Sequence, residues 1–307
     1  MRVAVTGGAG FIGSHLVERL VSRGDEVSVL DNLSSGKLEN LSRVLQRVKF
    51  VEGDIRDHMA IRSALKGAEV VVHLAALTSV RESMERPLLY NEVNSTGTLN
   101  LLNESTRLGI GKFVYISTCA VYGNPRSLPI KEEHETRPLS VYAASKLSAE
   151  EYCRTYSRLG KMGIAILRLF NVYGPRQAAG TYAGVITQFV ERVRQGLPPV
   201  IYGDGEQTRD FVHVLDVVEC ILRVMDNETW ETINIGSGRG TSIKQLSELV
   251  LRIAGKELKP VHEPARPEDI RHSRADVSKA RRLLGYMPRI GLEDGLKELM
   301  GYAAPAI

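Results

Sequence analysis

A glycine-rich run near the start of the chain restricts the possible folds more than any other stretch. The run Gly7-Gly8-Ala9-Gly10-Phe11-Ile12-Gly13 follows a strand-like segment at 2–6 and precedes a helical pattern that ends near Gly24. A second apolar run at 26–31 completes a β-α-β unit. In that context glycines permit a tight turn and close approach of a pyrophosphate, and the helix N-terminus supplies amide donors. The sequence therefore predicts a dinucleotide-binding turn.

The glycines fit two versions of the dinucleotide motif. The run reads as Gly8-x-Gly10-x-x-Gly13 or as Gly7-x-x-Gly10-x-x-Gly13, and the spacing does not choose between them. Under either version the same loop faces the cofactor. The expected contacts from this loop are Gly7, Gly10, Phe11, Ile12 and Gly13.

An acidic residue at the end of the second strand indicates which cofactor the turn accepts. Asp31 lies 18 residues after Gly13, where a carboxylate can accept both ribose hydroxyls of an adenosine. It would repel a 2′-phosphate, and neither Asn32 nor Leu33 supplies a compensating cation. We therefore predict NAD rather than NADP. Further contacts are expected from the polar loop beside the ribose, at Asn32, Ser35 and Gly36.

Strand-like and helical patterns alternate over the first 170 residues. Nearly continuous apolar strands are expected at 47–52, 69–74, 112–117 and 163–168, with helices at 57–66, 87–108 and 140–159. Apolar strands separated by helices are typical of a parallel sheet covered on both faces. The predicted fold is α/β, a Rossmann-type doubly wound parallel sheet.

Several residues fall at the carboxyl ends of these strands, where such sheets hold their ligands. The alanines at the end of 69–74 are small enough for a cofactor to approach closely. His73 is expected to be a hydrogen-bonded core histidine rather than a ligand, and Asn94 either faces solvent or bridges backbone groups beneath the site. Cofactor contacts are expected from Asp54, Ile55, Leu74, Ala75, Ala76, Asn94 and Ser117.

Tyr142 and Lys146 are four residues apart in the helical stretch 140–159, which places their side chains on one face. A phenol titrates near pH 10, and a nearby positive charge would lower its pKa towards the range useful for a base. This spacing is common and carries little weight alone. Thr118, at the end of the strand 112–117, could hydrogen-bond the same oxygen as Tyr142.

The sequence pattern changes after about residue 170, where turn-rich stretches separate the predicted helices and strands. We predict a cofactor domain at 1–170, to which the chain returns around 208–236, and a smaller α/β lobe at 171–307. A strand is expected at 232–235. Helices are expected at 182–195, 214–226, 242–254, 276–284 and 292–301.

Charge and cysteine content exclude several classes of function. The 40 basic and 36 acidic residues are scattered, which argues against nucleic-acid binding but leaves single arginines to hold an anionic small ligand. The three cysteines are widely separated, so neither a disulfide framework nor a metal site is expected. No apolar run is long enough to cross a bilayer, and no signal-peptide pattern is evident. These features predict a cytoplasmic protein without membrane contact.

Taken together, the motifs resemble those of the extended short-chain dehydrogenase/reductase superfamily, in its nucleotide-sugar epimerase branch. Each motif is weak alone, but their order and spacing over nearly the whole chain are specific. The resemblance rests on the glycine run, Asp31, Val-Val-His-Leu-Ala-Ala (71–76), Asn-Ser-Thr-Gly-Thr-Leu-Asn-Leu-Leu (94–102), Ser-Thr-Cys-Ala-Val-Tyr-Gly (117–123), Tyr142-x-x-x-Lys146, Arg-Leu-Phe-Asn-Val-Tyr-Gly-Pro (168–175), Arg209-Asp-Phe-Val-His-Val and Arg266-Pro-Glu-Asp269.

The resemblance implies NAD-dependent epimerisation at C4 of a UDP-hexose through a 4-keto intermediate. The catalytic group would be Thr118, Tyr142 and Lys146, with Tyr142 as the acid and base. Tyr142 and Lys146 would also contact the cofactor, with Lys146 on the nicotinamide ribose. The likeness is greatest to epimerases that interconvert UDP-galactose and UDP-glucose. A homodimer built on the helix of Tyr142 and its neighbour is also implied. Substrate contacts would come from Val80, Thr118, Asn171, Tyr202, Arg209, Arg266 and Asp269, of which Asn171, Arg209, Arg266 and Asp269 would hold the diphosphate.

Related activities remain as alternatives. Similar 4,6-dehydratases carry an Asp-Glu pair after the Thr, and similar decarboxylases a Glu, whereas this chain has Cys119 and Ala120. The alternatives are a UDP-glucuronate 4-epimerase or decarboxylase, a dTDP-sugar epimerase and a non-catalytic NAD-binding protein. Ser273 is small where some relatives have a bulky aromatic residue, which would admit N-acetylated hexoses. The segments 77–81 and 181–182 differ from those of some bacterial epimerases, which leaves the nucleobase and the retention of NAD open.

Overall fold

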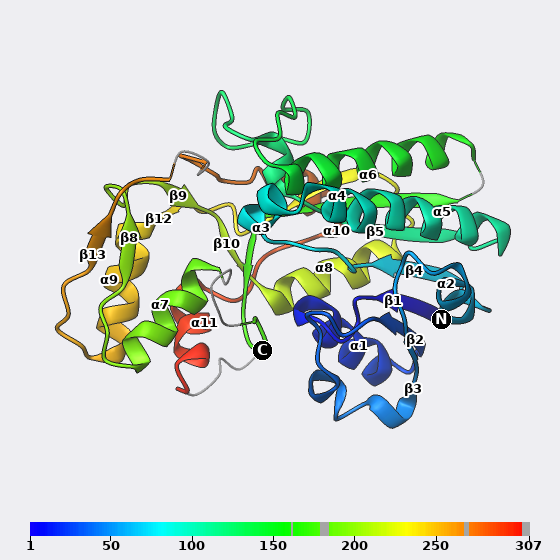
Figure 1. Ribbon diagram of the computed structural model, residues 1–307, viewed down its shortest axis with the longest axis horizontal. Coiled ribbons are helices and arrows are strands. Elements are labelled where there is room, and N and C mark those ends of the chain that lie inside the picture. The colour runs from blue at the N-terminus through cyan, green and yellow to red at the C-terminus, as the bar shows by residue number, and fades with distance from the viewer. Residues whose placement is uncertain (161, 179–183, 267–269, 303–307) are drawn as a thin grey trace. The chain divides into compact units, whose positions relative to one another are not determined.

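The computed structural model describes residues 1–160, 162–178, 184–266 and 270–302. The chain forms two compact units (Figure 1). The first consists of residues 1–121, 138–168 and 218–233. The second consists of residues 122–137 and 169–217 and of the chain from 234 onward.

The first unit is built on a seven-stranded sheet with the order β11-β6-β5-β4-β1-β2-β3. β1 pairs in parallel with β2 and β4, β2 with β3, and β4 with β5. The chain extends the sheet from β1 to β3 in one direction and then from β4 in the other, which makes it doubly wound and places the switch point between β1 and β4. The predicted fold class is confirmed. The strands are β1 (Arg2–Thr6), β2 (Glu26–Asp31), β3 (Val48–Glu52), β4 (Val70–His73), β5 (Lys112–Thr118), β6 (Gly163–Leu169) and β11 (Thr232–Ile235).

Helices cover both faces of this sheet. In Figure 1, α5 (Gly97–Arg107) and α6 (Val141–Arg158) lie on one face, and α1 (Phe11–Arg23) and α8 (Val214–Asp226) lie on the other. α2 (His58–Leu65) packs against α5. Apolar residues of these elements form a buried core around Leu101, Phe113 and Ile164. Short 3₁₀ turns occur at Leu38–Leu41, Leu45–Arg47 and Cys119–Tyr122.

The prediction of a single helix at 87–108 is wrong. The chain instead forms α3 (Val80–Glu85), α4 (Pro87–Tyr90), a π-helical turn η3 (Asn91–Thr96) and α5. A π turn inserts an extra residue and breaks the 3.6-residue repeat, and it occurs most often at functional sites. Its physical reason here is hydrogen bonding that a regular helix would not reach, because the buried side chain of Asn94 within the turn binds the backbone of Leu77.

Three two-stranded sheets and four helices form the described part of the second unit. Apolar residues of α7, α9, α11 and the strands enclose a core that includes Phe189, Leu246 and Leu296. The strand pairs are β7 (Asn171–Tyr173) with β10 (Phe211–His213), β9 (Thr208–Arg209) with β12 (Thr241–Ser242), and β8 (Val200–Tyr202) with β13 (Val261–Glu263). The helices are α7 (Val185–Arg194), α9 (Ile243–Ala254), α10 (Ser278–Leu284) and α11 (Leu292–Leu299).

Residues 122–137 cluster with the second unit, although they were expected in the first domain. The reason is long-range pairing near Ile130. Ile130 donates its backbone N–H to the carbonyl of Arg274 (2.8 Å) and accepts from the N–H of Asp276 (2.8 Å). Asn234 also donates its side-chain amide to the Ile130 carbonyl. Contacts across more than 100 residues decide this boundary, and no local pattern announces them. Among the described helices, none combines the length and apolar character needed to cross a membrane.

Candidate active site

The glycine run forms a tight turn between β1 and α1. Gly7 has a φ of +70°, and a Cβ there would lie 2.7 Å from the backbone nitrogen of Ala75. A Cβ on Gly13 would lie 2.1 Å from the carbonyl oxygen of Gly7, and one on Gly8 would lie 2.6 Å from the Val29 side chain. Gly10 is the least restricted, with its nearest contact at 3.1 Å. Both versions of the motif therefore mark positions where a side chain is excluded by packing.

The N-terminus of α1 presents amide donors at this turn. Gly10 precedes the first helical residue in an extended conformation, and no side chain caps the helix. The first amides of a helix have no partner inside it, and together with the helix dipole they favour an anion. Phe11 and Ile12 contribute to this first turn. The geometry fits a pyrophosphate.

We expect Gly13→Ala to abolish cofactor binding, because its Cβ would meet backbone 2.1 Å away and the turn would have to open. Gly10→Ala should have a smaller effect, because its Cβ would lie 3.1 Å from the nearest backbone atom and its φ of −77° suits an alanine. Isothermal titration calorimetry with NAD measures the affinity of both variants. Equal affinities of Gly13→Ala and the wild type would contradict the steric argument.

Asp31 ties the glycine turn to the loop after β2. Its buried carboxylate accepts N–H bonds from Ala9 and Leu33, both 2.9 Å long. Burial raises the pKa of Asp31, and the bonds from Leu33 and Ala9 work against that rise. A carboxylate has about four acceptor sites, so two accepted bonds leave capacity for ribose hydroxyls. A Cβ on Gly36 would lie 2.9 and 3.0 Å from the two carboxylate oxygens, so glycine keeps this approach open.

Two of the expected cofactor contacts bind each other. Asn32 donates to the carboxylate of Asp54 at 2.8 Å. Arg56, which the sequence did not bring to attention, holds both oxygens of Asp54 at 2.8 Å. Hydrogen bonds from Arg56 lower the pKa of Asp54 to about 2. The Arg56 guanidinium is therefore already engaged by a carboxylate, which agrees with the prediction of NAD rather than NADP.

Asn94 bridges backbone groups and does not face solvent. It accepts the N–H of Leu77 and donates to the Leu77 carbonyl, both at 2.9 Å, and also donates to Ser145 Oγ at 3.1 Å. The Ser145 hydroxyl in turn donates to the carbonyl of Tyr142 at 2.8 Å. The π turn thus connects the segment after β4 to the helix that carries Tyr142.

His73 is a hydrogen-bonded core histidine, as predicted. The hydroxyl of Thr98 donates to the Asn94 carbonyl at 2.6 Å, so its oxygen is left to accept from His73 Nε2 at 2.9 Å. His73 Nδ1 then accepts from the Thr6 hydroxyl at 2.7 Å. Burial lowers the pKa of His73 well below its usual value, and the charge of Lys146 adds to this effect. The imidazole is neutral, with its proton on Nε2.

Tyr142 is hydrogen-bonded to Thr118, the last residue of β5, and Lys146 lies one turn later on α6. Ser140 caps α6 by accepting the N–H of Ala143, and Tyr142 and Lys146 follow on one face of the helix. Burial raises the pKa of Tyr142 to about 12, against a hydrogen bond with Thr118 that lowers it. Burial also lowers the pKa of Lys146 to about 7.

The expected lowering of the Tyr142 pKa by Lys146 is therefore not found in the structure. Burial has the largest effect on the Tyr142 pKa, because it disfavours the charged phenolate. Desolvation of the phenolate, which the spacing of the two residues does not reveal, therefore decides the direction of the pKa shift.

A buried ionic cluster lies one helical turn beyond Lys146. Glu150, whose side chain is fully buried, binds Arg168 Nη2 at 2.7 Å and Nε at 2.9 Å. It also accepts from the Ser117 hydroxyl at 2.6 Å and from Arg154 at 2.5 Å. Ser117 was expected to contact the cofactor, but its hydroxyl donates its hydrogen bond to Glu150. Sequence reasoning missed this cluster, and its only signal was the continuation of the four-residue spacing to Glu150.

The predicted substrate residues lie mainly in the second unit. The guanidinium of Arg266 stacks 3.5 Å above the ring of Tyr202, so the structure brings these two together. Arg209 ends β9 and donates to the carbonyl of Thr208. Asn171 starts β7 and pairs with Phe211 of β10. Val80, by contrast, begins α3 in the first unit. Asp269 and the segment 181–182 lie outside the described residues.

Asp210, which follows Arg209, was also missed. Its fully buried carboxylate accepts from the backbone of Ser237, Gly238 and Ala275 and from the Ser237 hydroxyl, at 2.6–3.0 Å. These bonds join three segments around β9. The sequence feature that could have identified Asp210 is its position directly before the apolar Phe-Val of β10. Ser273, also buried, donates its N–H to the carbonyl of Thr208 in β9.

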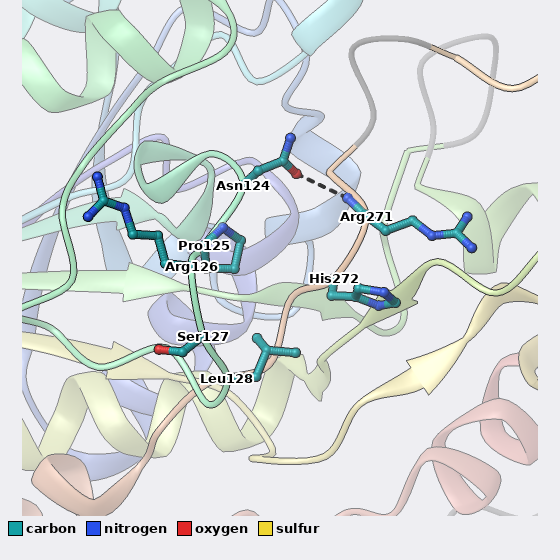
Figure 2. A pocket seen from close by; sticks show the side chains of 7 residues that line it. All are labelled: Asn124, Pro125, Arg126, Ser127, Leu128, Arg271 and His272. Atoms are coloured by element: carbon teal, nitrogen blue, oxygen red, sulfur yellow. Dashed lines mark hydrogen bonds between the residues drawn. The ribbon is translucent and has the colours of Figure 1, made fainter.

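A hollow of about 340 Å³ lies in the second unit (Figure 2). Asn124 accepts the backbone N–H of Arg271 across it at 3.2 Å, and the Arg271 guanidinium is paired with Asp204. None of the residues predicted for the active site lines it. Its walls are Asn124, Pro125, Arg126, Ser127, Leu128, Arg271 and His272. The described residues contain no group of three or more His, Cys, Asp or Glu placed to hold a metal ion.

Comparisons with known proteins agree with this geometry. The family described as GDP-mannose 4,6 dehydratase matches residues 4–299. A UDP-glucose 4-epimerase from Mycolicibacterium smegmatis is 37% identical over 98% of each chain. A UDP-N-acetyl-α-D-glucosaminuronate decarboxylase from Bacillus cytotoxicus is 35% identical over 97% of this chain and 96% of its own.

Solved structures show the same similarity. The UDP-glucose 4-epimerase of Thermotoga maritima, crystallised with UDP-glucose, has a TM-score of 0.94 and 42% identity over 98% of each chain. The UDP-glucose 4-epimerase of Thermus thermophilus, in complex with NAD, has a TM-score of 0.89 and 40% identity over 97% of each chain. The glycine turn, the Thr118–Tyr142–Lys146 group and these matches lead to one conclusion: the chain belongs to the GDP-mannose 4,6-dehydratase family of short-chain dehydrogenases/reductases, among the nucleotide-sugar epimerases and dehydratases.

Proposed function

We propose that the protein is an NAD-dependent epimerase acting at C4 of a UDP-hexose, and that it interconverts UDP-galactose and UDP-glucose. The observation that carries this proposal is the hydrogen bond of Tyr142 with Thr118 at the end of β5, with Lys146 one turn later on α6 and no acid at positions 119 and 120. Similarity to UDP-glucose 4-epimerases over nearly the full chain supports it.

NAD is the cofactor that the residues of the first unit fit. The turn at Gly7 and Gly13 has no room for side chains, the N-terminus of α1 offers uncapped amides, and Asp31 keeps acceptor capacity for ribose hydroxyls. When bound, NAD supplies the acceptor for a hydride and, once reduced, its donor. The related Thermus thermophilus enzyme was solved with NAD.

Tyr142 is proposed to move the proton at the sugar O4. As a phenolate it would accept the hydroxyl proton during oxidation and return it during reduction. Thr118, which hydrogen-bonds Tyr142, would orient the same oxygen. Lys146, in its protonated form, would stabilise the phenolate. In the second unit, Asn171, Arg209 and Arg266 are proposed to bind the diphosphate, because the planar guanidinium suits phosphate oxygens.

Elimination of water needs a second acid and base, and decarboxylating relatives carry a further carboxylate. Cys119 and Ala120 supply neither, which favours epimerisation. The second candidate is an enzyme for UDP-glucuronate or its N-acetylated form, because such a decarboxylase is 35% identical to this chain. A small residue at 273 leaves N-acetylated hexoses as further candidates. By the same resemblance we propose a homodimer, and the cytoplasmic location stays a prediction.

The deciding experiment incubates the purified protein with UDP-galactose without added NAD. We expect UDP-glucose as the product, because NAD is regenerated in each cycle and would be carried by the protein. Parallel reactions with UDP-N-acetylglucosamine, UDP-glucuronate and dTDP-glucose rank the substrates by kcat/KM. A pentose product from UDP-glucuronate would identify a decarboxylase instead. Absence of any conversion, with NAD added, would contradict the proposal.

A further inference from the structure

Tyr115 contacts both ends of Lys146. The Lys146 ammonium lies 4.3 Å from the centre of the Tyr115 ring. The hydroxyl of the same tyrosine donates to the backbone carbonyl of Lys146 at 3.3 Å. Tyr115 is fully buried on β5, three residues before Thr118. One side chain thus supports both the charged group and the helical backbone of the proposed catalytic lysine.

The ring face is a favourable neighbour for a buried ammonium. An aromatic ring carries negative potential on its face, and the attraction to a cation strengthens when water is excluded. Lys146 is only 3% exposed, so little solvent competes. Burial also raises the pKa of the Tyr115 phenol well above its usual value, so this ring stays neutral. Its contribution to the charge of Lys146 therefore comes from the ring face rather than from a phenolate.

The other titratable groups near Lys146 lie on β4 and α6. His73, on β4, packs against Tyr115 with ring centres 5.6 Å apart, and burial lowers its pKa well below the usual value. Burial lowers the Lys146 pKa, the charge of Glu150 on α6 acts to raise it, and Cys153, also on α6, has a pKa raised by burial. Tyr142 precedes Lys146 by one turn. Glu150 is itself engaged by Arg168. The Tyr115 ring is in direct contact with the ammonium, 4.3 Å from its centre.

We propose that Tyr115 is a positioning residue for Lys146, whose ring keeps the ammonium charged and holds it on the face of α6 that carries Tyr142. This inference rests on the proposed function, because it assigns Lys146 a task there. It adds a residue that no motif marks, since a tyrosine in the middle of an apolar strand reads as core.

The test changes the charge distribution of the ring without changing its shape. Tyr115→Phe is the parent, and 4-fluoro-, 3,5-difluoro- and 3,4,5-trifluorophenylalanine replace that phenylalanine by nonsense suppression. The pKa of Lys146 is read from its 13Cε signal by NMR, assigned by its loss in Lys146→Met. We expect Tyr115→Phe to resemble the wild type and the pKa to fall stepwise with fluorination, by about one pH unit in total.

A matched control and a second measurement separate the possible failures. Phe113, two residues earlier on β5 and equally buried, packs on His73 with ring centres 6.0 Å apart, and its fluorination should leave the Lys146 pKa unchanged. The graded series stays informative if the most fluorinated variant fails to fold. An unchanged Lys146 pKa across the Tyr115 series would overturn the inference.

Activity is measured separately. If the wild type does not convert UDP-galactose, the proposed function fails, while the NMR series still decides whether Tyr115 sustains the charge. If it does, the pH dependence of kcat should shift with the Lys146 pKa in the Tyr115 series. A fall in kcat at every pH, without a shift in the profile, would indicate a structural effect and contradict the role of the ring.

Discussion

Tyr142→Phe is expected to lower kcat for UDP-galactose by about 10³-fold, because it removes the group that exchanges the proton at O4. The rest of the ring stays, so binding of NAD and UDP should change little. The pKa of Tyr142 is raised to about 12 by burial, so any activity that depends on its phenolate rises with pH in the wild type. That rise should disappear in the variant. Steady-state kinetics between pH 6 and 9 and calorimetry with UDP measure these effects.

Tyr152→Phe is the matched control on the same helix. Tyr152 packs against the apolar core of the first unit rather than on Thr118, and its variant should retain wild-type kcat. If Tyr142→Phe turned over UDP-galactose at a near-normal rate, Tyr142 would not be the acid and base. If it also lost UDP binding, the loss of activity would reflect a disturbed fold.

Arg168→Met is expected to destabilise the protein by about 3–5 kcal/mol, because it leaves the buried carboxylate of Glu150 without its main partner. Glu150 is fully buried and Arg168 only 3% exposed, with Nη2 to Oε2 at 2.7 Å. Denaturant unfolding of the purified variant measures the change. Because unfolding of two units need not be a single transition, protection of the α6 amides from hydrogen exchange is the second readout.

Two companions test the mechanism behind that loss. Arg154→Met removes a partner of the same carboxylate that is 25% exposed, and it should cost at most about 1 kcal/mol. The double variant Glu150→Leu/Arg168→Met removes both buried charges and should be more stable than Arg168→Met alone. If the destabilisation of the double variant equalled the sum of those of Glu150→Leu and Arg168→Met, the two buried charges would not be coupled.

The same pair has a defined pH dependence. Burial alone would raise the pKa of Glu150, but the hydrogen bonds and charge of Arg168 outweigh it, so that the pKa lies below 4.5. A lowered carboxyl pKa means that the pair's stabilisation is present above the pKa of the unfolded chain. It is lost as the pH falls through the folded pKa. The difference in stability between wild type and Arg168→Met should accordingly shrink below about pH 4.5.

Local sequence was sufficient to predict the glycine turn and the strands of the first unit. The glycines, Asp31 and the alternation of apolar strands with helices act within short stretches, where steric exclusion and periodicity operate on neighbouring residues. The doubly wound sheet could be predicted from them, and the strand bounds differ by at most one residue from those expected. In the second unit the turn-rich sequence hides strands of two or three residues, such as β9 and β12, whose existence depends on distant partners.

By itself, the sequence determined the family resemblance, the fold class and the residues at the cofactor turn, because side-chain size and spacing settle these locally. Only the tertiary structure decided that Asn94 sits on a π turn, that residues 122–137 join the second unit and that Glu150, Asp210 and Tyr115 make buried contacts with residues distant in the chain. It also reversed the expected pKa shift of Tyr142. The physical reason is common to all of these. Burial and hydrogen bonding depend on groups that are far apart in the chain, and desolvation takes effect only when those groups come together.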